Sequence, residues 1–329
     1  MKAVVIRAYG TPDVLGVEEV PTPTPAPGQV LVRVEAVSVN YADIVRRRND
    51  PYPVPTPLPA ILGGEVAGYI DALGDGVTGF ALGDPVFGLL GAGGGYAQYA
   101  AINVGHVIPL PVGFDLDIAC TLVVAGVTAY QTLKEAGQLQ AGESVFIPGA
   151  VGGVGSYALQ LAKILGAGTV IAGAGTSERR DEALRRGADH AIDYTSDDWP
   201  QLVKAVTNGR GADVVLDMAG GKIFDQSLAA LAPFGRLIVY GSASREPTSL
   251  VPRTLMPQNQ TVTGYYVPQW FVGRPKRSVE AFHALVDLIT AGKLDVPVAS
   301  RLPLDRAAEA HKTMESRQST GKFELKPWA

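Results

Sequence analysis

A glycine-rich turn holds the residue types that are best suited to bind a ligand. The segment VFIPGAVGGVGSYALQLAK spans 145–163. Gly152 and Gly153 would let the backbone approach a pyrophosphate, and Gly155 would let the following helix pack on the preceding strand. Ala150 stands where the first glycine of a G-x-G-x-x-G motif is usual, which requires a φ there that is not positive. A purely structural bend is the alternative, but a strand before the turn and an amphipathic helix after it favour a dinucleotide site.

The residues after the next strand indicate which nicotinamide cofactor would bind. An acid about 20 residues beyond the turn would hold the ribose 2′-hydroxyl of NAD, but Ala174 occupies this position. Hydroxyls and cations that suit a 2′-phosphate follow, at Thr176, Ser177, Arg179 and Arg180. These residues favour NADPH, and they also suit a helix start that Ser177 caps.

Metal-ligating residue types are few and scattered. The four histidines, His106, His190, His283 and His311, belong to different predicted elements and lack ligand spacing. Cys120 is the only cysteine, so no disulfide can form within the chain, and a cytoplasmic location is the expectation. The sequence therefore predicts no metal site.

Composition excludes several classes of partner. The 329 residues suit two domains, and 47% hydrophobic against 18% charged residues suits a globular core. A net charge of −4 provides no basic field for nucleic acid or anionic lipid, so we expect neither partner. No segment reaches the ~18 apolar residues of a membrane span, and the first residues are too polar for a signal peptide.

The elements that must position these residues change character along the chain. The first third contains proline-rich tracts and runs that resemble strands, at 2–8, 29–39 and 65–73. From about Thr121 strands alternate with helices: strands near 144–148, 169–174, 190–194, 212–220 and 235–242, and helices near 153–165, 177–186, 199–207 and 222–231. Repeated units of this length predict a parallel, doubly wound sheet.

Several motifs together resemble the zinc-independent quinone oxidoreductases of the medium-chain dehydrogenase/reductase superfamily, the group that contains ζ-crystallin. They are VSVNYADIVRRR, LGGEVAGYI, GFALGDPVFG, GGGYAQYA, AGVTAYQTL, the glycine turn, LRRGADHAIDY and GKFELKP. Alanine is common in this branch where Ala150 stands. The resemblance implies an α/β protein with a GroES-like, mostly β catalytic domain at 1–120 and 261–329, and an inserted Rossmann domain with a doubly wound parallel sheet at 121–260.

The same resemblance implies that the chain lacks the zinc sites of the related alcohol dehydrogenases. The histidine of the zinc alcohol dehydrogenases corresponds to Gly64, and GLLGAGGGYAQYA replaces the cysteine cluster of their structural lobe. Glu65 remains beside it, and we interpret it as a structural hydrogen-bond acceptor rather than a catalyst. Resemblance thus implies a reductase without a metal.

The resemblance also places residues around the acceptor. It sets Asn40 near the nicotinamide and substrate, Tyr41 and Tyr52 at the pocket border, and Asp43 and Arg47 at its rim. A tyrosine hydroxyl is protonated at neutral pH and is a possible proton donor. Alternatively, Asp43 caps a helix that begins near Ile44.

The arginine run 46–48 is a departure from the family. Its members often carry a tyrosine at the position of Arg46 or Arg47, so this departure leaves the substrate class open and would admit an anionic or more polar acceptor. A solvated helix face is the alternative interpretation.

For the cofactor, the resemblance implies contacts from both predicted domains. It assigns Thr128 to the nicotinamide amide, the turn to the pyrophosphate, Arg179 to the 2′-phosphate, and the end of the strand near 240 to the nicotinamide. The assigned residues are Thr128, Ala150, Gly152, Gly153, Val154, Thr176, Ser177, Arg179, Tyr194, Gly241, Ser242, Tyr265, Tyr266 and Lys322.

The function predicted from sequence is an NADPH-dependent, metal-free reductase, a homodimer by resemblance, that transfers hydride to quinones or other electron-poor conjugated acceptors. One alternative is an enone or trans-2-enoyl double-bond reductase. Another is an NADPH-binding protein with a structural or regulatory role and little turnover.

Overall fold

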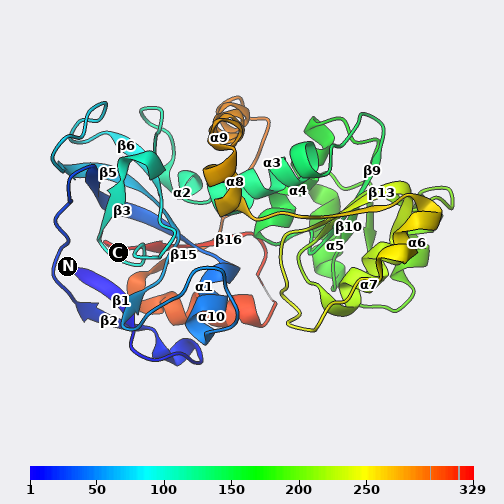
Figure 1. Cartoon of the computed structure of the whole chain (residues 1–329), viewed down its shortest axis with the longest axis horizontal. Coiled ribbons are helices and arrows are strands. Elements are labelled where there is room, and N and C mark those ends of the chain that lie inside the picture. The colour runs from blue at the N-terminus through cyan, green and yellow to red at the C-terminus, as the bar shows by residue number, and fades with distance from the viewer. Residues whose placement is uncertain (297, 318) are drawn as a thin grey trace. The chain divides into compact units, whose positions relative to one another are not determined.

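A computed structural model describes residues 1–296, 298–317 and 319–329. The chain forms two compact units, Met1–Val124 with Pro297–Ala329, and Ala125–Val296 (Figure 1). The predicted first boundary, at 120, lies close to the observed one. The second does not, because the segment 261–296 belongs to the second unit, where its first strand extends the parallel sheet.

The first unit is mostly β structure. Its strands are β1 (Lys2–Ile6), β2 (Gly16–Glu19), β3 (Gln29–Val39), β4 (Ala60–Ile61), β5 (Glu65–Leu73), β6 (Pro85–Leu89), β7 (Tyr99–Asn103), β8 (Val107–Pro109), β15 (Val298–Pro303) and β16 (Lys322–Lys326). Within the described residues they form a sheet of order β2-β1-β4 and a sheet of order β15-β16-β3-β5-β6-β8, in which β7 also pairs with β3. β3 is rich in valine and is buried along most of its length, as a central strand requires.

Three helices belong to this unit: α1 (Tyr41–Arg48), α2 (Leu116–Ala119) and α10 (Ala307–Glu315). α1 begins directly after β3, earlier than the predicted start near Ile44. Asp43 accepts a hydrogen bond from the Asn40 backbone N–H at 2.9 Å and so stabilises the first turn. The helix ends at Asn49, which has a left-handed φ of 59°.

The second unit is built on a parallel sheet, as the alternating pattern predicts. Its strands are β9 (Ser144–Pro148), β10 (Thr169–Gly173), β11 (His190–Ile192), β12 (Ala212–Asp217), β13 (Leu231–Val239) and β14 (Thr261–Gly264), in the order β11-β10-β9-β12-β13-β14. All of these neighbours pair in parallel. The carboxyl ends of the strands therefore lie on one edge of the sheet, where ligands of such folds bind.

Helices connect these strands, as the ribbon shows (Figure 1). The connecting helices are α4 (Gly153–Ile164), α5 (Ser177–Arg185), α6 (Trp199–Val206) and α7 (Gly221–Ala230), whereas α3 (Thr128–Gln131) precedes β9, and α8 (Val267–Gly273) and α9 (Pro275–Thr290) follow β14. Phe146 of β9 stacks on Trp199 of α6 with ring centroids 4.7 Å apart, at the centre of the buried cluster. Among helices in the described ranges, none has the length and apolar composition needed to cross a membrane.

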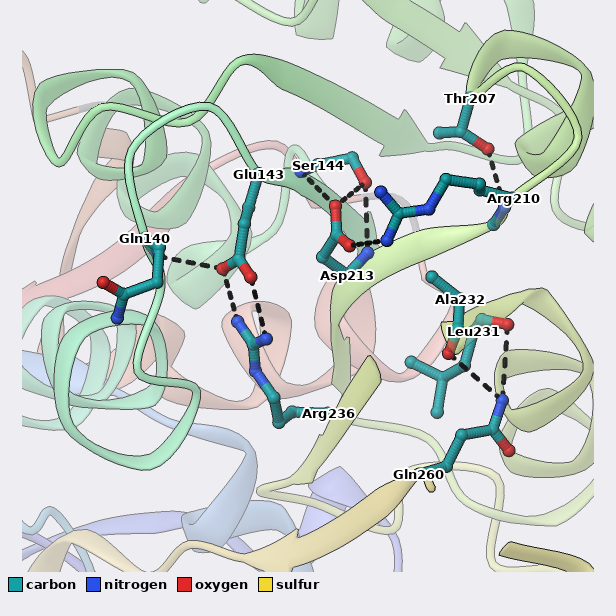
Figure 2. Close-up of polar contacts among 11 residues, drawn as sticks. Gln140, Glu143, Ser144, Thr207, Arg210, Asp213, Leu231, Ala232, Arg236 and Gln260 are labelled. Atoms are coloured by element: carbon teal, nitrogen blue, oxygen red, sulfur yellow. Dashed lines mark hydrogen bonds and ion pairs between the residues drawn. The ribbon is translucent and has the colours of Figure 1, made fainter. Parts of the chain in front are cut away.

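Ion pairs link the amino ends of the central strands (Figure 2). Arg236 of β13 makes two hydrogen bonds to the carboxylate of Glu143, which precedes β9. Asp213 of β12 accepts from the Ser144 hydroxyl at 2.7 Å and from Arg210 at 3.0 Å. These contacts fix the relative positions of β9, β12 and β13 at the edge opposite the glycine turn.

Candidate functional site

The turn after β9 has the backbone that close approach by a phosphate requires. Gly149 has a φ of +64°, whereas Ala150 is buried and its φ is not positive, as predicted. A Cβ on Gly155 would lie 2.4 Å from the Gly149 carbonyl oxygen, so glycine is needed where α4 packs on the turn. Gly152 is the N-cap of α4 and no side chain caps this helix. The N-terminus of α4 is thus available to an anionic group.

The loop after β10 carries the residues predicted for the 2′-phosphate. Thr176 is the N-cap of α5 and accepts from the Arg179 N–H at 3.4 Å. The predicted cap at Ser177 is therefore wrong by one residue, because Thr176 still has an extended backbone while Ser177 begins the helix. Arg180 pairs with Asp193 at 3.0 Å, and Arg179 lies in the first turn of α5.

Tyr194 follows β11 and therefore lies at the same edge of the sheet as Thr176, which follows the neighbouring strand β10. Thr176 is exposed to solvent and Tyr194 is partly exposed. The structure thus brings Thr176 and Arg179, at the start of α5, and Tyr194, after β11, to the same edge of the sheet.

The ends of β9, β12 and β13 also meet closely. A Cβ on Gly241 would lie 2.7 Å from the Met218 carbonyl oxygen, and a Cβ on Gly149 would lie 2.6 Å from the Met218 side chain. Ser242 follows directly and is exposed. Glycine at 241 therefore permits the close approach of these loops beside the turn.

Thr128 lies in the same unit, at the start of α3. It is buried and contacts Tyr265, whose hydroxyl donates to Gln131 at 2.8 Å. Tyr265 is thus part of the polar core next to Thr128. Tyr266 is the N-cap of α8 and is half-buried.

In the first unit, Asn40 belongs to a buried polar cluster. Its amide oxygen accepts from the Lys322 ammonium, and its amide nitrogen donates to the Ser38 hydroxyl at 3.0 Å. Glu65 accepts from Ser38 at 2.5 Å and from the Val124 N–H at 2.8 Å, so its predicted role as an acceptor is confirmed. Burial raises the pKa of Glu65, although the Lys322 ammonium 3.8 Å away opposes this shift.

Lys322 is thus held in the first unit by Asn40 and by the Val39 carbonyl oxygen. Lys322 is only 5% exposed, and these oxygens satisfy the hydrogen-bond donors of its buried ammonium. The arrangement places the buried cation of Lys322 on β16 and the amide of Asn40 directly after the neighbouring strand β3.

Arg47 does not lie at a pocket rim. Its side chain is fully buried and pairs with Glu315 of α10. Nearby, the Tyr96 hydroxyl donates to Asp43 at 3.2 Å and lies 3.0 Å from Nε2 of His311. Burial lowers the pKa of His311 to about 3, so the ring is neutral at physiological pH. Arg47 therefore belongs to the packing between α1 and α10.

The preceding arginine faces a cavity instead. Arg46 and Tyr52 line a hollow of about 230 Å³ together with Asn49, Asp50, Pro51, Val54, Pro55 and Thr56. The Arg46 guanidinium carbon lies 5.9 Å from the centre of the Tyr52 ring. Tyr41, the other predicted border residue, begins α1 and is partly exposed. Arg46, rather than the Arg47 that the resemblance assigned to the rim, lines this hollow, while Arg47 pairs with Glu315.

A larger cavity of about 540 Å³ lies at the amino edge of the parallel sheet, away from the glycine turn. Its cations are Lys204 and Arg210, and the latter already binds Asp213 (Figure 2). Gln260 at its wall donates to the carbonyl oxygens of Leu231 and Ala232. The polar groups of this hollow are largely engaged in holding the strands.

Two family models match the chain. The alcohol dehydrogenase GroES-like domain matches residues 26–112, and a model described as zinc-binding dehydrogenase matches residues 153–290. In the part of the chain that the structure describes, no group of three or more His, Cys, Asp or Glu residues could hold a metal ion.

Similar proteins align along the whole chain. It is 34% identical to 2-haloacrylate reductase of a Burkholderia species and 32% identical to quinone oxidoreductase of Pseudomonas aeruginosa, with 99% of each chain covered in both cases. The structure of Escherichia coli quinone oxidoreductase complexed with NADPH matches with a TM-score of 0.92 at 30% identity, over 99% of this chain and 100% of that one.

Proposed function

The chain belongs to the zinc-independent quinone oxidoreductase branch of the medium-chain dehydrogenase/reductase superfamily, and we propose that it is an NADPH-dependent reductase of quinones or other electron-poor conjugated acceptors. The observation that carries the proposal is the glycine turn between β9 and α4, with Thr176 and Arg179 beyond the adjacent strand. The two full-length relatives are named as reductases of a quinone and of an electron-poor alkene, which fits this reaction class.

The cofactor site fits NADPH in its own residues. The α4 N-terminus and the glycines would hold the pyrophosphate, and Arg179 and Thr176 would bind the 2′-phosphate. Ala174 offers no carboxylate to repel that phosphate. The bound cofactor would supply a hydride, which an electron-poor carbon or quinone ring accepts.

The protein's share of the chemistry is to position the acceptor and to stabilise the charge that develops on it. The Lys322 ammonium and the Asn40 amide are pre-oriented by Glu65 and Ser38, so little reorganisation is needed when charge develops nearby. Tyr52 carries a hydroxyl that is protonated at neutral pH and borders the Arg46 cavity. We assign Asn40, Lys322 and Tyr52 to the acceptor side.

Cofactor oxidation with a panel of acceptors tests this function. Purified protein is mixed with NADPH and then with 1,4-naphthoquinone, an enone or an enoyl thioester, and absorbance of the reduced cofactor is followed. We expect quinone to be reduced and NADPH to be preferred over NADH. Cofactor binding without oxidation by any acceptor would contradict the proposal and favour an NADPH-binding protein with little turnover, whereas preference for the thioester would favour a double-bond reductase.

A second part of the proposal is that the chain forms a homodimer. β14 is the last strand of the parallel sheet and pairs with β13 alone among the described strands, and exposed edges of this kind associate readily. Phe234, within β13, and Met256, on the segment that leads into β14, are 69% and 72% exposed. Light scattering should give twice the chain mass for the wild type, and Thr263→Pro should lower it; a wild-type monomer would refute the dimer.

The cytoplasm is the proposed location. Cys120 is the only cysteine, so no disulfide forms within the chain, which fits a reducing compartment. It is buried, and burial raises its pKa well above the ordinary value, so the thiol is a poor nucleophile.

A further inference from the structure

Asp217 is a buried carboxylate that only backbone groups compensate. It ends β12 at the carboxyl edge of the parallel sheet and is fully buried, and no residue in the described ranges forms an ion pair with it. Its Oδ1 accepts from the backbone N–H of Ala219 at 2.8 Å and from that of Gly220 at 3.1 Å. Burial raises the pKa of Asp217, and these two donors oppose the rise. Keeping a buried charge without a cation is costly, which indicates a role besides packing.

The other aspartate of β12 has a different environment. Asp213, near the amino end of the strand, accepts from the Ser144 hydroxyl at 2.7 Å and pairs with Arg210 at 3.0 Å (Figure 2). Lys222, in the first turn of α7, pairs with Asp197 and not with Asp217. The strand thus carries an acid with a cation partner at one end and an acid without one at the edge where ligands of such folds bind.

The turn that Asp217 stabilises contacts both loops that we assign to the cofactor. The Met218 carbonyl oxygen accepts from the Ala243 N–H at 3.0 Å, and it would lie 2.7 Å from a Cβ on Gly241. The terminal methyl carbon of Met218 would lie 2.6 Å from a Cβ on Gly149. The residue after Asp217 therefore packs against the glycine turn and against the end of β13, which the resemblance assigns to the nicotinamide.

A fixed negative charge at this edge has a defined effect on the cofactor. In the proposed reaction a quinone gains a hydride, with its electron pair, from NADPH and a proton from solvent, and it becomes a hydroquinone while NADPH becomes NADP⁺. The nicotinamide changes from neutral to cationic in this step, and a nearby carboxylate favours the cationic form. Since Asp217 is fully buried, dissolved salt screens its charge weakly.

We propose that Asp217 is a positioning residue of the cofactor site, which holds the turn beside Gly149 and Gly241 and whose charge makes the protein favour NADP⁺ over NADPH. This rests on the proposed function. Asp217 acts through Met218 and through its electric field, without contacting the acceptor. Its charge therefore promotes release of the hydride.

The dissociation constants of the two cofactor forms test the role of the charge. Fluorescence titration with NADPH and calorimetry with NADP⁺ give the ratio of Kd for NADP⁺ to Kd for NADPH. Asp217→Asn removes the charge but keeps one oxygen that can accept from both N–H groups, so we expect this ratio to increase about 5- to 10-fold. Asp213→Asn, near the opposite end of the same strand, is the matched control and should leave the ratio unchanged.

Kinetics and a second variant separate the charge from the turn. With 1,4-naphthoquinone, Asp217→Asn should lower kcat several-fold while KM for NADPH changes little, because the neutral form of the nicotinamide does not respond to the charge. Asp217→Ala removes the hydrogen-bond acceptor as well, so it should also weaken the binding of both cofactor forms. If Asp217→Ala does not fold, the ratio in Asp217→Asn decides the proposal.

Salt dependence identifies the charge as a buried one. Both cofactor forms carry the same phosphates, so the contribution of the phosphates cancels in the ratio, and the shift in Asp217→Asn should persist at high salt. An unchanged ratio in Asp217→Asn, an equal shift in Asp213→Asn, or a shift that disappears at high salt would overturn the proposal.

The same measurements distinguish this inference from the proposed function. If quinone is reduced but the ratio in Asp217→Asn equals that of the wild type, the inference fails and the proposed function stands. If no acceptor is reduced but the ratio shifts as expected, the proposed function fails and the role of Asp217 in cofactor binding stands. If the wild type binds neither cofactor form, both fail.

Discussion

Replacing Glu324 by glutamine is expected to stabilise the protein at alkaline pH. Glu324 of β16 is fully buried, and neither of its carboxylate oxygens has a hydrogen-bond partner among the described residues. Burial, reinforced by the charge of Asp117, raises its pKa from 4.5 to about 8. Arg301 lies 3.7 Å away and only partly offsets this, because its side chain is half-exposed and already binds Asp117.

The sign of the effect follows from proton binding. Between pH 4.5 and about 8 the unfolded chain loses this proton while the folded chain retains it, so the free energy of unfolding falls as the pH rises. The slope is at most about 1.4 kcal/mol per pH unit, which gives about 5 kcal/mol over the whole interval as an upper bound. Screening by solvent around Arg301 and relaxation of the folded protein reduce this loss of stability. We therefore expect the free energy of unfolding to fall by about 2–4 kcal/mol over the interval.

Urea unfolding from pH 5 to pH 8.5, followed by circular dichroism, measures this difference. At pH 5 the wild type and Glu324→Gln should agree within about 1 kcal/mol, since both side chains are neutral and nearly isosteric. At pH 8.5 the variant should be the more stable. Glu280→Gln, at an exposed side chain, is the control and should show no such trend. A stability difference for Glu324→Gln that is independent of pH would refute the reasoning.

Three further predictions concern the second unit. Arg179→Ala should reduce kcat/KM about 10- to 100-fold for NADPH and little for NADH, because one charge-assisted contact to the 2′-phosphate is lost; equal losses would contradict that role. Gly155→Ala should abolish NADPH binding in a fluorescence titration, because its Cβ would lie 2.4 Å from the Gly149 carbonyl oxygen, and normal affinity would show that the turn relaxes freely. Arg236→Met should lower the free energy of unfolding by about 1–2 kcal/mol, because the bidentate pair with Glu143 is lost. Urea midpoints at low and high salt measure this effect, and an unchanged midpoint would show that the pair contributes nothing to stability.

The parallel sheet could be predicted from sequence because each strand is a short apolar run and each helix has a clear boundary. β9 coincides with the run SVFIP, and α5 starts at the predicted Ser177. The boundary at 260 could not be predicted in this way. A proline-rich, irregular segment precedes β14, and only pairing with β13, a tertiary contact, shows that β14 extends the sheet.

The acceptor side was less predictable. The run Arg46–Arg48 gives three cations of one type, and its spacing does not show which of them pair with a distant carboxylate such as Glu315. Arg47 is buried because Glu315 lies opposite, and its position 268 residues later in the chain leaves no local signal. The cluster of Asn40 with Lys322 is equally remote in sequence, although the GKFELKP motif drew attention to Lys322.

The long distance in sequence between Asn40 and Lys322 determines the order in which the two units can fold during synthesis. The second unit is continuous in sequence, so it can complete its fold on the ribosome as soon as residue 296 has emerged. β3 obtains β16 as a neighbour, and Asn40 obtains Lys322, only after the second unit has been synthesised. Until then Glu65 lacks the ammonium of Lys322, 3.8 Å away in the folded protein. The acceptor side is therefore assembled after the cofactor-binding sheet, and a chain that stops before β16 would contain that sheet without the cation that we assign to the acceptor.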